Sequence, residues 1–239
     1  MEILEYKNLL NSEKAWFNQG RLKLFNHFIK KLSKKNLSIL EIGCGMGTNV
    51  EMLSKYGYVD GVEPAEIAIS NCKKRFPNNK FFKKNIEELE NKKKYDLICL
   101  FDVLEHIDDD LQALNTISDL LEDNGDILIS VPAYMFMWSS HDESLHHYRR
   151  YTSTGIQEIV KKTNLYLQRS TYFNTLLFPI AFVERKIVRN KFNKEYNAKN
   201  LPKLIDFVFK MILFFEVFLI NLFRLPFGLT IMVHLKKRA

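Results

Sequence analysis

The chain has 239 residues, of which 46% are hydrophobic and 26% are charged. A chain of this length makes one or two domains at about 150 residues each, and its apolar content offsets the entropy cost of ordering. These values exclude a disulfide-stapled mini-protein and a wholly disordered chain. The 35 Lys and Arg residues against 28 acids give a net charge of +7, which fits an anionic substrate or membrane surface but does not demonstrate nucleic-acid binding.

The cysteines and the first residues predict a cytoplasmic protein without a metal ion. Cys44, Cys72 and Cys99 have neither the even number of a disulfide framework nor the paired spacing of a zinc site. The first seven residues carry acids where a signal peptide would have a basic start followed by a continuous apolar run.

The predicted elements form an α/β protein. An amphipathic helix is expected over 12–32, because apolar residues recur there at steps of three and four. Further along, short apolar runs alternate with helix-like segments, a pattern typical of a doubly wound, mostly parallel sheet with helices on both faces. The seven expected strands are 37–42, 57–62, 80–82, 96–101, 126–131, 166–172 and 229–236. Helices are expected from Pro64, over 111–121 before Asn124 and Gly125, and over 154–162.

A glycine-rich segment follows the first predicted strand. Gly43, Gly45 and Gly47 alternate with other residues before a helix that opens near Thr48. Glycine allows a tight turn and the close approach of a ligand that a Cβ atom would exclude. Dinucleotide enzymes place another glycine where Thr48 stands, so a pyrophosphate ligand is disfavoured.

An acidic residue supports a nucleoside ligand at this loop. Glu63 ends the second strand twenty residues after Gly43, where a carboxylate can accept the hydroxyl groups of a ribose. The alternative is an ordinary strand-to-helix turn with a glutamate in front of Pro64.

These motifs resemble the class I S-adenosylmethionine-dependent methyltransferases. Residues 41–47 resemble their first motif, and Glu63 resembles their ribose-binding acid. Residues 85–89 resemble the segment that frames the adenine, and 96–107 resemble the fourth-strand motif that ends in Asp-Val-Leu-Glu-His. The resemblance implies a Rossmann-like cofactor-binding core over 36–172, after a helical segment over 1–35. An apolar and basic helical insertion over 173–228 then precedes a last strand over 229–239.

The resemblance also implies which residues hold S-adenosylmethionine. Asn85 stands where members of the family often have Asp, and its amide oxygen can still accept a hydrogen bond from the adenine. A structural histidine in the first helical turn explains His106 as well as a catalytic role does. The implied cofactor contacts are Glu41, Gly43, Cys44, Gly45 and Gly47 for the methionine part, Glu63 and Pro64 for the ribose, Asn85 and Ile86 for the adenine, and Phe101, Asp102 and Val103 for the loop beneath the sulfonium.

A polar and aromatic segment after the fifth strand is expected to meet the methyl acceptor. Its His-Asp and His-x-Arg-Arg-Tyr pattern resembles a methyltransferase subgroup often associated with cell-surface glycan or lipid pathways. His141 or His147 would act as the base, oriented by Asp142. Alternatively, the segment is an ordered lid in which Asp142 pairs with an arginine. The residues expected to bind the acceptor are Arg149, Arg150 and Tyr151.

The apolar run 204–223 is long enough to span a bilayer, but its charges oppose this. Asp206 and Lys210 fall on one stripe of the helix, with Glu216 beside it, which predicts a helix lying in the membrane plane. A basic stretch precedes it: seven basic residues, Arg185, Lys186, Arg189, Lys191, Lys194, Lys199 and Lys203, against two acids. A buried helix or a homodimer interface is the alternative.

The sequence therefore predicts a methyltransferase that uses S-adenosylmethionine and releases S-adenosylhomocysteine. Its acceptor would be a lipid-linked or amphiphilic small molecule or glycan, methylated at an oxygen at the cytoplasmic face of a membrane. The alternatives are a non-catalytic cofactor-binding protein that recruits a partner, a methyltransferase of a soluble small molecule, and a nicotinamide-dependent oxidoreductase. Nucleic acid is not expected as a partner, because no base-flipping motif follows the fourth strand.

Overall fold

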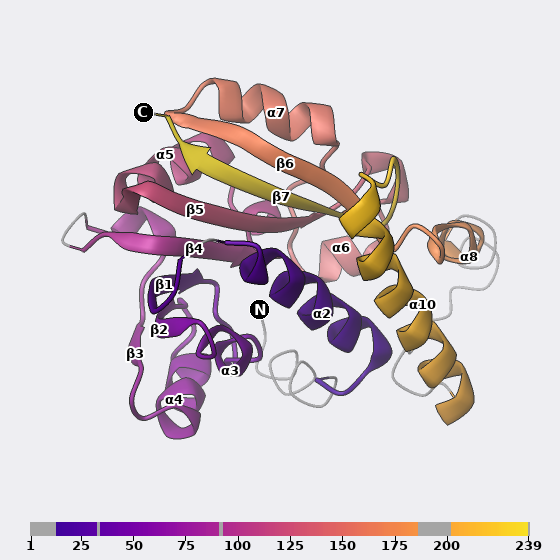
Figure 1. Cartoon of the computed structure of the whole chain (residues 1–239), viewed down its shortest axis with the longest axis horizontal. Helices are drawn as coiled ribbons and strands as arrows, with labels where there is room; N and C mark the ends of the chain where they lie inside the picture. The colour runs from indigo at the N-terminus through magenta and orange to yellow at the C-terminus, as the bar shows by residue number, and fades with distance from the viewer. Residues whose placement is uncertain (1–12, 33, 91–92, 186–201, 239) are drawn as a thin grey trace.

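The computed structural model describes residues 13–32, 34–90, 93–185 and 202–238. Its centre is a seven-stranded sheet with the strand order β3-β2-β1-β4-β5-β7-β6 (Figure 1). Strands β1 to β5 run parallel, and β7 pairs antiparallel with both β5 and β6. The strands are β1 (Leu37–Ile42), β2 (Gly57–Val62), β3 (Lys80–Phe82), β4 (Tyr95–Phe101), β5 (Leu121–Pro132), β6 (Leu165–Phe173) and β7 (Thr230–Lys237).

All seven predicted strands are present, and the mostly parallel sheet is confirmed. The largest difference lies at β5, which begins five residues earlier than expected. Leu121 already pairs with Tyr95, and the register shifts before Leu97 pairs with Asp126. Asn124 and Gly125 therefore lie within an irregular strand start rather than at the end of the preceding helix.

Helices cover both faces of the sheet (Figure 1). Two of them, α5 (Asp110–Leu120) and α7 (Ser153–Lys161), enclose one apolar core against the sheet. The opposite core is enclosed by four others: α2 (Trp16–Lys30), α3 (Val50–Leu53), α4 (Glu66–Arg75) and α10 (Lys203–Leu222). Two short helices, α6 (Ser140–Ser144) and α8 (Phe178–Val183), lie outside both cores.

Side-chain caps fix the starts of α5 and α7. The Asp109 carboxylate accepts a hydrogen bond from the Gln112 N–H (2.8 Å), and the Thr152 hydroxyl accepts one from the Gly155 N–H (3.0 Å). Such caps satisfy backbone donors that have no partner within the helix. The helix expected over 111–121 is thus confirmed as α5, which begins at Asp110.

The predicted apolar insertion forms α10, which packs along α2. A Cβ atom on Gly20 would lie 2.3 Å from Leu213 Cδ1, so the two helices approach as closely as glycine permits. At their first turns the Trp16 N–H donates to the Asp206 carboxylate (3.2 Å). Lys186, Arg189, Lys191, Lys194 and Lys199 lie outside the described residues.

One side of α10 is buried and the other is exposed. Leu213, Glu216, Val217 and Ile220 are buried. Several large apolar side chains on the other side remain exposed, with Phe215 at 53% and Phe218 at 56%. Among the helices of the described residues, none has both the length and the apolar content needed to cross a membrane.

Replacing Leu213 with Ala tests the packing of α10 on α2. Removing a buried leucine side chain leaves a cavity, so we expect Leu213→Ala to lower the free energy of unfolding by about 3 kcal/mol, measured by urea denaturation. The control Leu222→Ala removes an exposed leucine of the same helix and should change it by less than about 0.5 kcal/mol. Equal effects of the two substitutions would contradict this packing.

Candidate functional site

The predicted ligand-binding residues gather at one edge of the sheet. Strands β1, β2 and β4 are neighbours and run parallel, so the residues that follow them lie at the same edge. Gly43, Glu63 and Asp102 are the first residues after these three strands. Open parallel sheets bind ligands at this edge.

The glycine loop after β1 has a backbone that only glycine adopts easily. Gly43, Gly45 and Gly47 have φ angles of +67°, +51° and +81°, which L side chains disfavour. A Cβ atom on Gly43 would lie 2.4 Å from Val103 Cγ2, whereas one on Gly45 would meet no atom within 4 Å. The loop is therefore packed on the β4 side and open at Gly45.

The Glu63 carboxylate braces this loop from the end of β2. Its two oxygens accept hydrogen bonds from the N–H groups of Gly45 and Ala65, each at 3.1 Å. Glu63 is buried, and Pro64 beside it is exposed. Each carboxylate oxygen can accept a further hydrogen bond, so Glu63 can hold a ligand hydroxyl while it supports the loop.

Glu41 is a buried carboxylate beneath the loop with one unused oxygen. Its Oε1 accepts a hydrogen bond from Asn49 Nδ2 (2.8 Å), and its Oε2 has no partner among the described residues. Burial is the main cause that raises the pKa of Glu41 to about 8; the Asn49 hydrogen bond opposes the shift, and the nearby charge of Glu63 adds to it. A cationic group placed near Oε2 would favour the ionised form.

Arg21, which the sequence analysis did not single out, pairs with Asp102 at the end of β4. The two side chains form an ion pair, and Ser130 Oγ donates to Asp102 Oδ1 (3.1 Å). Asp102 has a φ of +56°, which turns the chain sharply after the strand. The Phe101 ring stacks on Phe25 in the core, with ring centroids 3.7 Å apart, so only the backbone of Phe101 is left for the expected loop beneath the sulfonium.

The predicted adenine-binding residues follow β3. Asn85 is exposed and starts a short 3₁₀ turn (Ile86–Glu88). Its N–H donates to the Glu88 carboxylate (2.7 Å). Ile86 is buried in the core that α5 and α7 enclose, whereas Cys44 of the glycine loop is buried in the opposite core.

The predicted acceptor segment is tied to the core by a buried ion pair. Arg150 Nε and Nη2 donate to the two oxygens of Asp142 at 2.7 and 3.0 Å, and Nη1 donates to the Ala133 carbonyl. Although burial disfavours its charged form, hydrogen bonds from His147 and Arg150 hold the pKa of Asp142 well below its usual value. This pairing is the ordered-lid arrangement that the sequence left open.

Arg149 and Tyr151 also have partners within the protein. Arg149 Nη1 lies 3.0 Å from Asp110 Oδ2, and the Tyr151 hydroxyl donates to the same carboxylate (3.0 Å). Of the three residues expected to bind the acceptor, Arg150 and Tyr151 are buried and Arg149 is partly exposed, and their contact with an acceptor stays a prediction.

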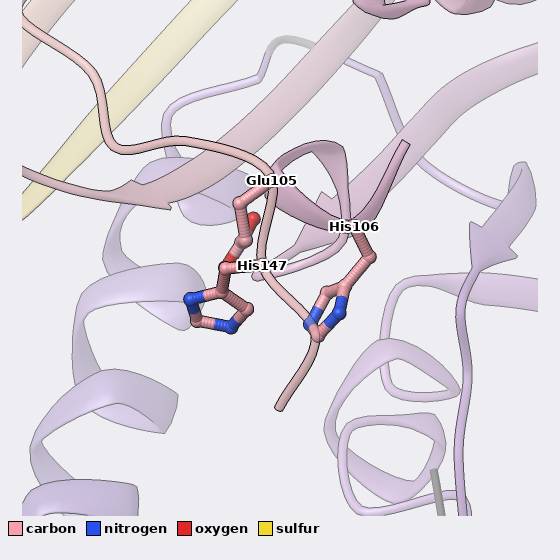
Figure 2. Close-up of side chains that lie close together, drawn as sticks. All are labelled: Glu105, His106 and His147. Carbon is pink, nitrogen blue, oxygen red and sulfur yellow. The ribbon is translucent and has the colours of Figure 1, made fainter. Parts of the chain in front are cut away.

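Glu105, His106 and His147 form a compact cluster beside this ion pair. Each residue offers one atom that could bind a metal ion, and these three atoms lie within 4.8 Å of one another. Figure 2 shows the two imidazoles next to each other, with Glu105 and His106 on the turn after β4. The ring centroids are 4.5 Å apart, with the rings nearly perpendicular.

Burial controls the charge of this cluster. It raises the pKa of Glu105 to about 8, although Arg21 and Arg150 oppose the shift. It lowers the pKa of His106 to about 4, helped by the charge of His147. The Glu105 Oε2 atom has no hydrogen-bond partner among the described residues.

The two histidines expected to act as the base have different surroundings in the structure. His147 Nδ1 lies 3.0 Å from Asp142 Oδ1, whereas His141 is exposed on α6. In the sequence, His106 stands out only as a lone histidine, and Glu105 is not distinguished from other acids. The one available signal was their place in the Asp-Val-Leu-Glu-His motif.

Comparison with known proteins identifies related enzymes. Residues 17–170 match the family model of the methyltransferase domain. Ubiquinone biosynthesis O-methyltransferase of Rickettsia typhi is 26% identical over 224 residues, which cover 78% of this chain and 89% of that protein. The mitochondrial enzyme of the same name from Dictyostelium discoideum is 29% identical over 131 residues, covering 46% of this chain and 41% of that protein.

A solved structure shares the fold. The plantazolicin methyltransferase BpumL, in complex with SAH and a monoazolic desmethylPZN analog, has a TM-score of 0.61 and 15% sequence identity. The match covers 98% of this chain and 90% of that chain.

The two buried glutamates predict an unusual dependence of stability on pH. Glutamate in an unfolded chain titrates near 4.3, and Glu41 and Glu105 titrate near 8 in the folded protein. The folded state therefore holds protons that the unfolded state has lost. We therefore expect the free energy of unfolding to fall as the pH rises from 6.5 to 8, by about 1 kcal/mol per pH unit for each glutamate. This range lies above the normal titration of histidine.

Substitution of one glutamate checks the cause of this dependence. Glu41→Gln should reduce the slope by roughly half, because Glu105 still titrates. The control substitution Glu66→Gln, at an exposed glutamate, should leave the slope unchanged. Urea denaturation at several pH values measures both, and a slope that Glu41→Gln does not alter would contradict the burial of an ionisable Glu41.

Proposed function

Because this chain belongs to the methyltransferase domain family, we propose that it transfers the methyl group of S-adenosylmethionine to an oxygen atom of an amphiphilic acceptor. The observation that carries this proposal is the cradle at the ends of β1 and β2. There Glu63 braces a glycine loop that is open at Gly45, and Glu41 near the end of β1 has an unused Oε2.

The residues present fit this cofactor. Its ribose hydroxyls suit the carboxylate of Glu63, and its cationic amino group suits Glu41, whose ionised form a nearby cation favours. The open space at Gly45 leaves room for the ligand to approach the backbone. S-adenosylmethionine supplies an electrophilic methyl group, and the protein supplies its position and that of the acceptor.

The chemistry requires a place for one proton. The acceptor oxygen forms a bond to the methyl carbon as the carbon–sulfur bond breaks, and the bonding electrons return to sulfur to give S-adenosylhomocysteine. The acceptor hydroxyl loses its proton. His147 suits this task better than His141, because Asp142 holds its Nδ1 in place beside the end of β4.

An aromatic cluster at the same edge supports an apolar acceptor. The Tyr134 ring, just after β5, stacks on those of Tyr172 and Phe136, with centroids 5.3 and 5.0 Å apart. Phe136 and Phe178 continue the cluster onto α8, where Ile180 is 56% exposed. Tyr134 has a φ of +63°, a strained conformation of the kind that clusters at functional sites.

The orientation of α10 supports contact with a membrane. Its acids face the protein: Asp206 accepts a hydrogen bond from the Trp16 N–H, and the buried Glu216 accepts one from the Leu176 N–H. The opposite side exposes a row of large apolar residues at steps of three and four: Leu204, Phe207, Met211, Phe215, Phe218 and Leu222.

Basic groups lie on α2 and β6, which pack beside α10. Lys23, Lys31 and Arg169 are close enough that their charges lower the pKa of His27, after burial, to about 4. An apolar face beside basic groups is typical of a protein that rests on an anionic leaflet. These features support the proposal that the enzyme works at the cytoplasmic face of a membrane, on a lipid-linked or apolar acceptor such as a quinone precursor or a glycan intermediate.

Cofactor binding is tested by calorimetric titration with S-adenosylhomocysteine. The wild-type protein should bind it, and Glu63→Ala should weaken binding about 10- to 100-fold, because hydrogen bonds to a charged group are worth about 1.5–3 kcal/mol. The control Glu66→Ala, at an exposed acid on α4, should bind normally. No binding to the wild-type protein would sink the proposal, and tight binding without methyl transfer to membrane extracts would favour a non-catalytic protein.

Membrane contact is tested by flotation with vesicles that contain anionic lipid. Each phenylalanine contributes about 1.5–3 kcal/mol when it is buried. The double substitution Phe215→Ser and Phe218→Ser should therefore reduce vesicle binding about 100-fold or more. The exposed Tyr166 of β6 provides the control Tyr166→Ser. A wild-type protein that fails to float, but forms a dimer that the double substitution disrupts, would show that this face binds a second copy instead.

A further inference from the structure

The cluster of Glu105, His106 and His147 has three donor atoms available on converging side chains. The Nδ1 atom of His147 is engaged by Asp142, and the ring of His106 is hydrogen-bonded to the backbone of Leu145. Each imidazole therefore keeps its second nitrogen for another partner. Glu105 is buried, and its Oε2 has no partner among the described residues.

This arrangement has the supporting contacts of a metal site. Histidines that bind a metal through one nitrogen almost always donate the other N–H to a carboxylate, a backbone carbonyl or water. Here Asp142 serves His147 and the Leu145 backbone serves His106. Asp142 is itself fixed by two hydrogen bonds from Arg150, so the His147 ring is held in a defined orientation.

The local charges leave one carboxylate uncompensated. Arg21 and Arg150 are the basic side chains that face Glu105. Each is already paired, Arg21 with Asp102 and Arg150 with Asp142. An ionised Glu105 would therefore be the remaining unpaired charge in a buried site, and a cation would neutralise it.

We propose that Glu105, His106 and His147 bind a divalent transition-metal ion. Two imidazoles and one carboxylate suit zinc, manganese, iron or cobalt better than magnesium or calcium, which prefer oxygen ligands. The ligand atoms lie within 4.8 Å of one another, and a central ion at about 2.0–2.2 Å from each would draw them together. Three protein ligands leave coordination positions open.

The role of the ion rests on the proposed function. Val103, which packs on Gly43 of the cofactor loop, lies two residues before Glu105, so the ion would lie beside the methyl donor. An acceptor hydroxyl held at an open position has its pKa lowered by the ion. Its proton then passes to water rather than to His147, and the oxygen attacks the methyl carbon as the carbon–sulfur bond breaks.

The test is titration of the chelator-treated full-length protein with Co²⁺ and with Zn²⁺. We expect one tightly bound ion per chain and visible ligand-field absorption of Co²⁺ without a thiolate charge-transfer band. His147→Ala and Glu105→Gln should each weaken binding about 100-fold. His141→Ala, at an exposed histidine of the same segment, should have no effect. Circular dichroism checks that each variant folds.

Three results would overturn the proposal: no tight binding to the wild-type protein, a thiolate band, or equal binding by wild type and His147→Ala. If the His147 and Glu105 variants do not fold, the wild-type protein still tests the metal site: one bound ion per chain without a thiolate band supports it, and a thiolate band or the absence of tight binding refutes it. Titration with S-adenosylhomocysteine on the same samples separates the two proposals. Normal cofactor binding without metal binding refutes only the metal site, whereas metal binding without cofactor binding refutes the proposed function.

Discussion

Parallel pairing of β1 with β2 and β4 is the constraint on which the rest of this structure depends. It brings Gly43, Glu63 and Asp102, distant in the sequence, to one edge of the sheet. The apolar side chains of the strands are enclosed on both faces by helices, and the polar residues of the candidate site lie near the ends of the strands. The cofactor cradle and the acidic and imidazole cluster both lie at this edge.

Burial of carboxylates at this edge lowers the stability of the folded protein. Glu41 and Glu105 are buried carboxylates, and each has an oxygen without a partner among the described residues. A buried carboxylate without full hydrogen bonding favours its neutral form. Asp142 is also fully buried but is paired with Arg150 and His147, so it stays ionised and positions its neighbours. Buried carboxylates that retain an unused oxygen are those best placed to meet a charged ligand.

The sequence predicts the parts of the fold that depend on local patterns. Apolar runs locate all seven strands, and the glycine spacing locates a loop whose three glycines have positive φ angles. It does not predict pairings between distant residues. Arg21 of α2 binds Asp102 after β4, and this pairing depends on how separate elements pack. The burial of Glu105 is likewise a property of the folded chain.

The helix α10 shows the same limit. Its periodicity predicts a polar stripe and an apolar face, but not which of them faces the protein. The structure turns Asp206 and Glu216 inward, where backbone N–H groups bind them, and leaves Phe215 and Phe218 exposed. The exposed side of the helix is the one that the proposed membrane contact would use.

The most direct measurement is a crystal structure of the protein with S-adenosylhomocysteine. The proposed function predicts that the ribose hydroxyls contact Glu63 and that the sulfur atom lies at the Val103 loop, facing the cluster of Glu105, His106 and His147. A ligand bound elsewhere, or one whose sulfur faces away from this cluster, would contradict methyl transfer at this edge of the sheet.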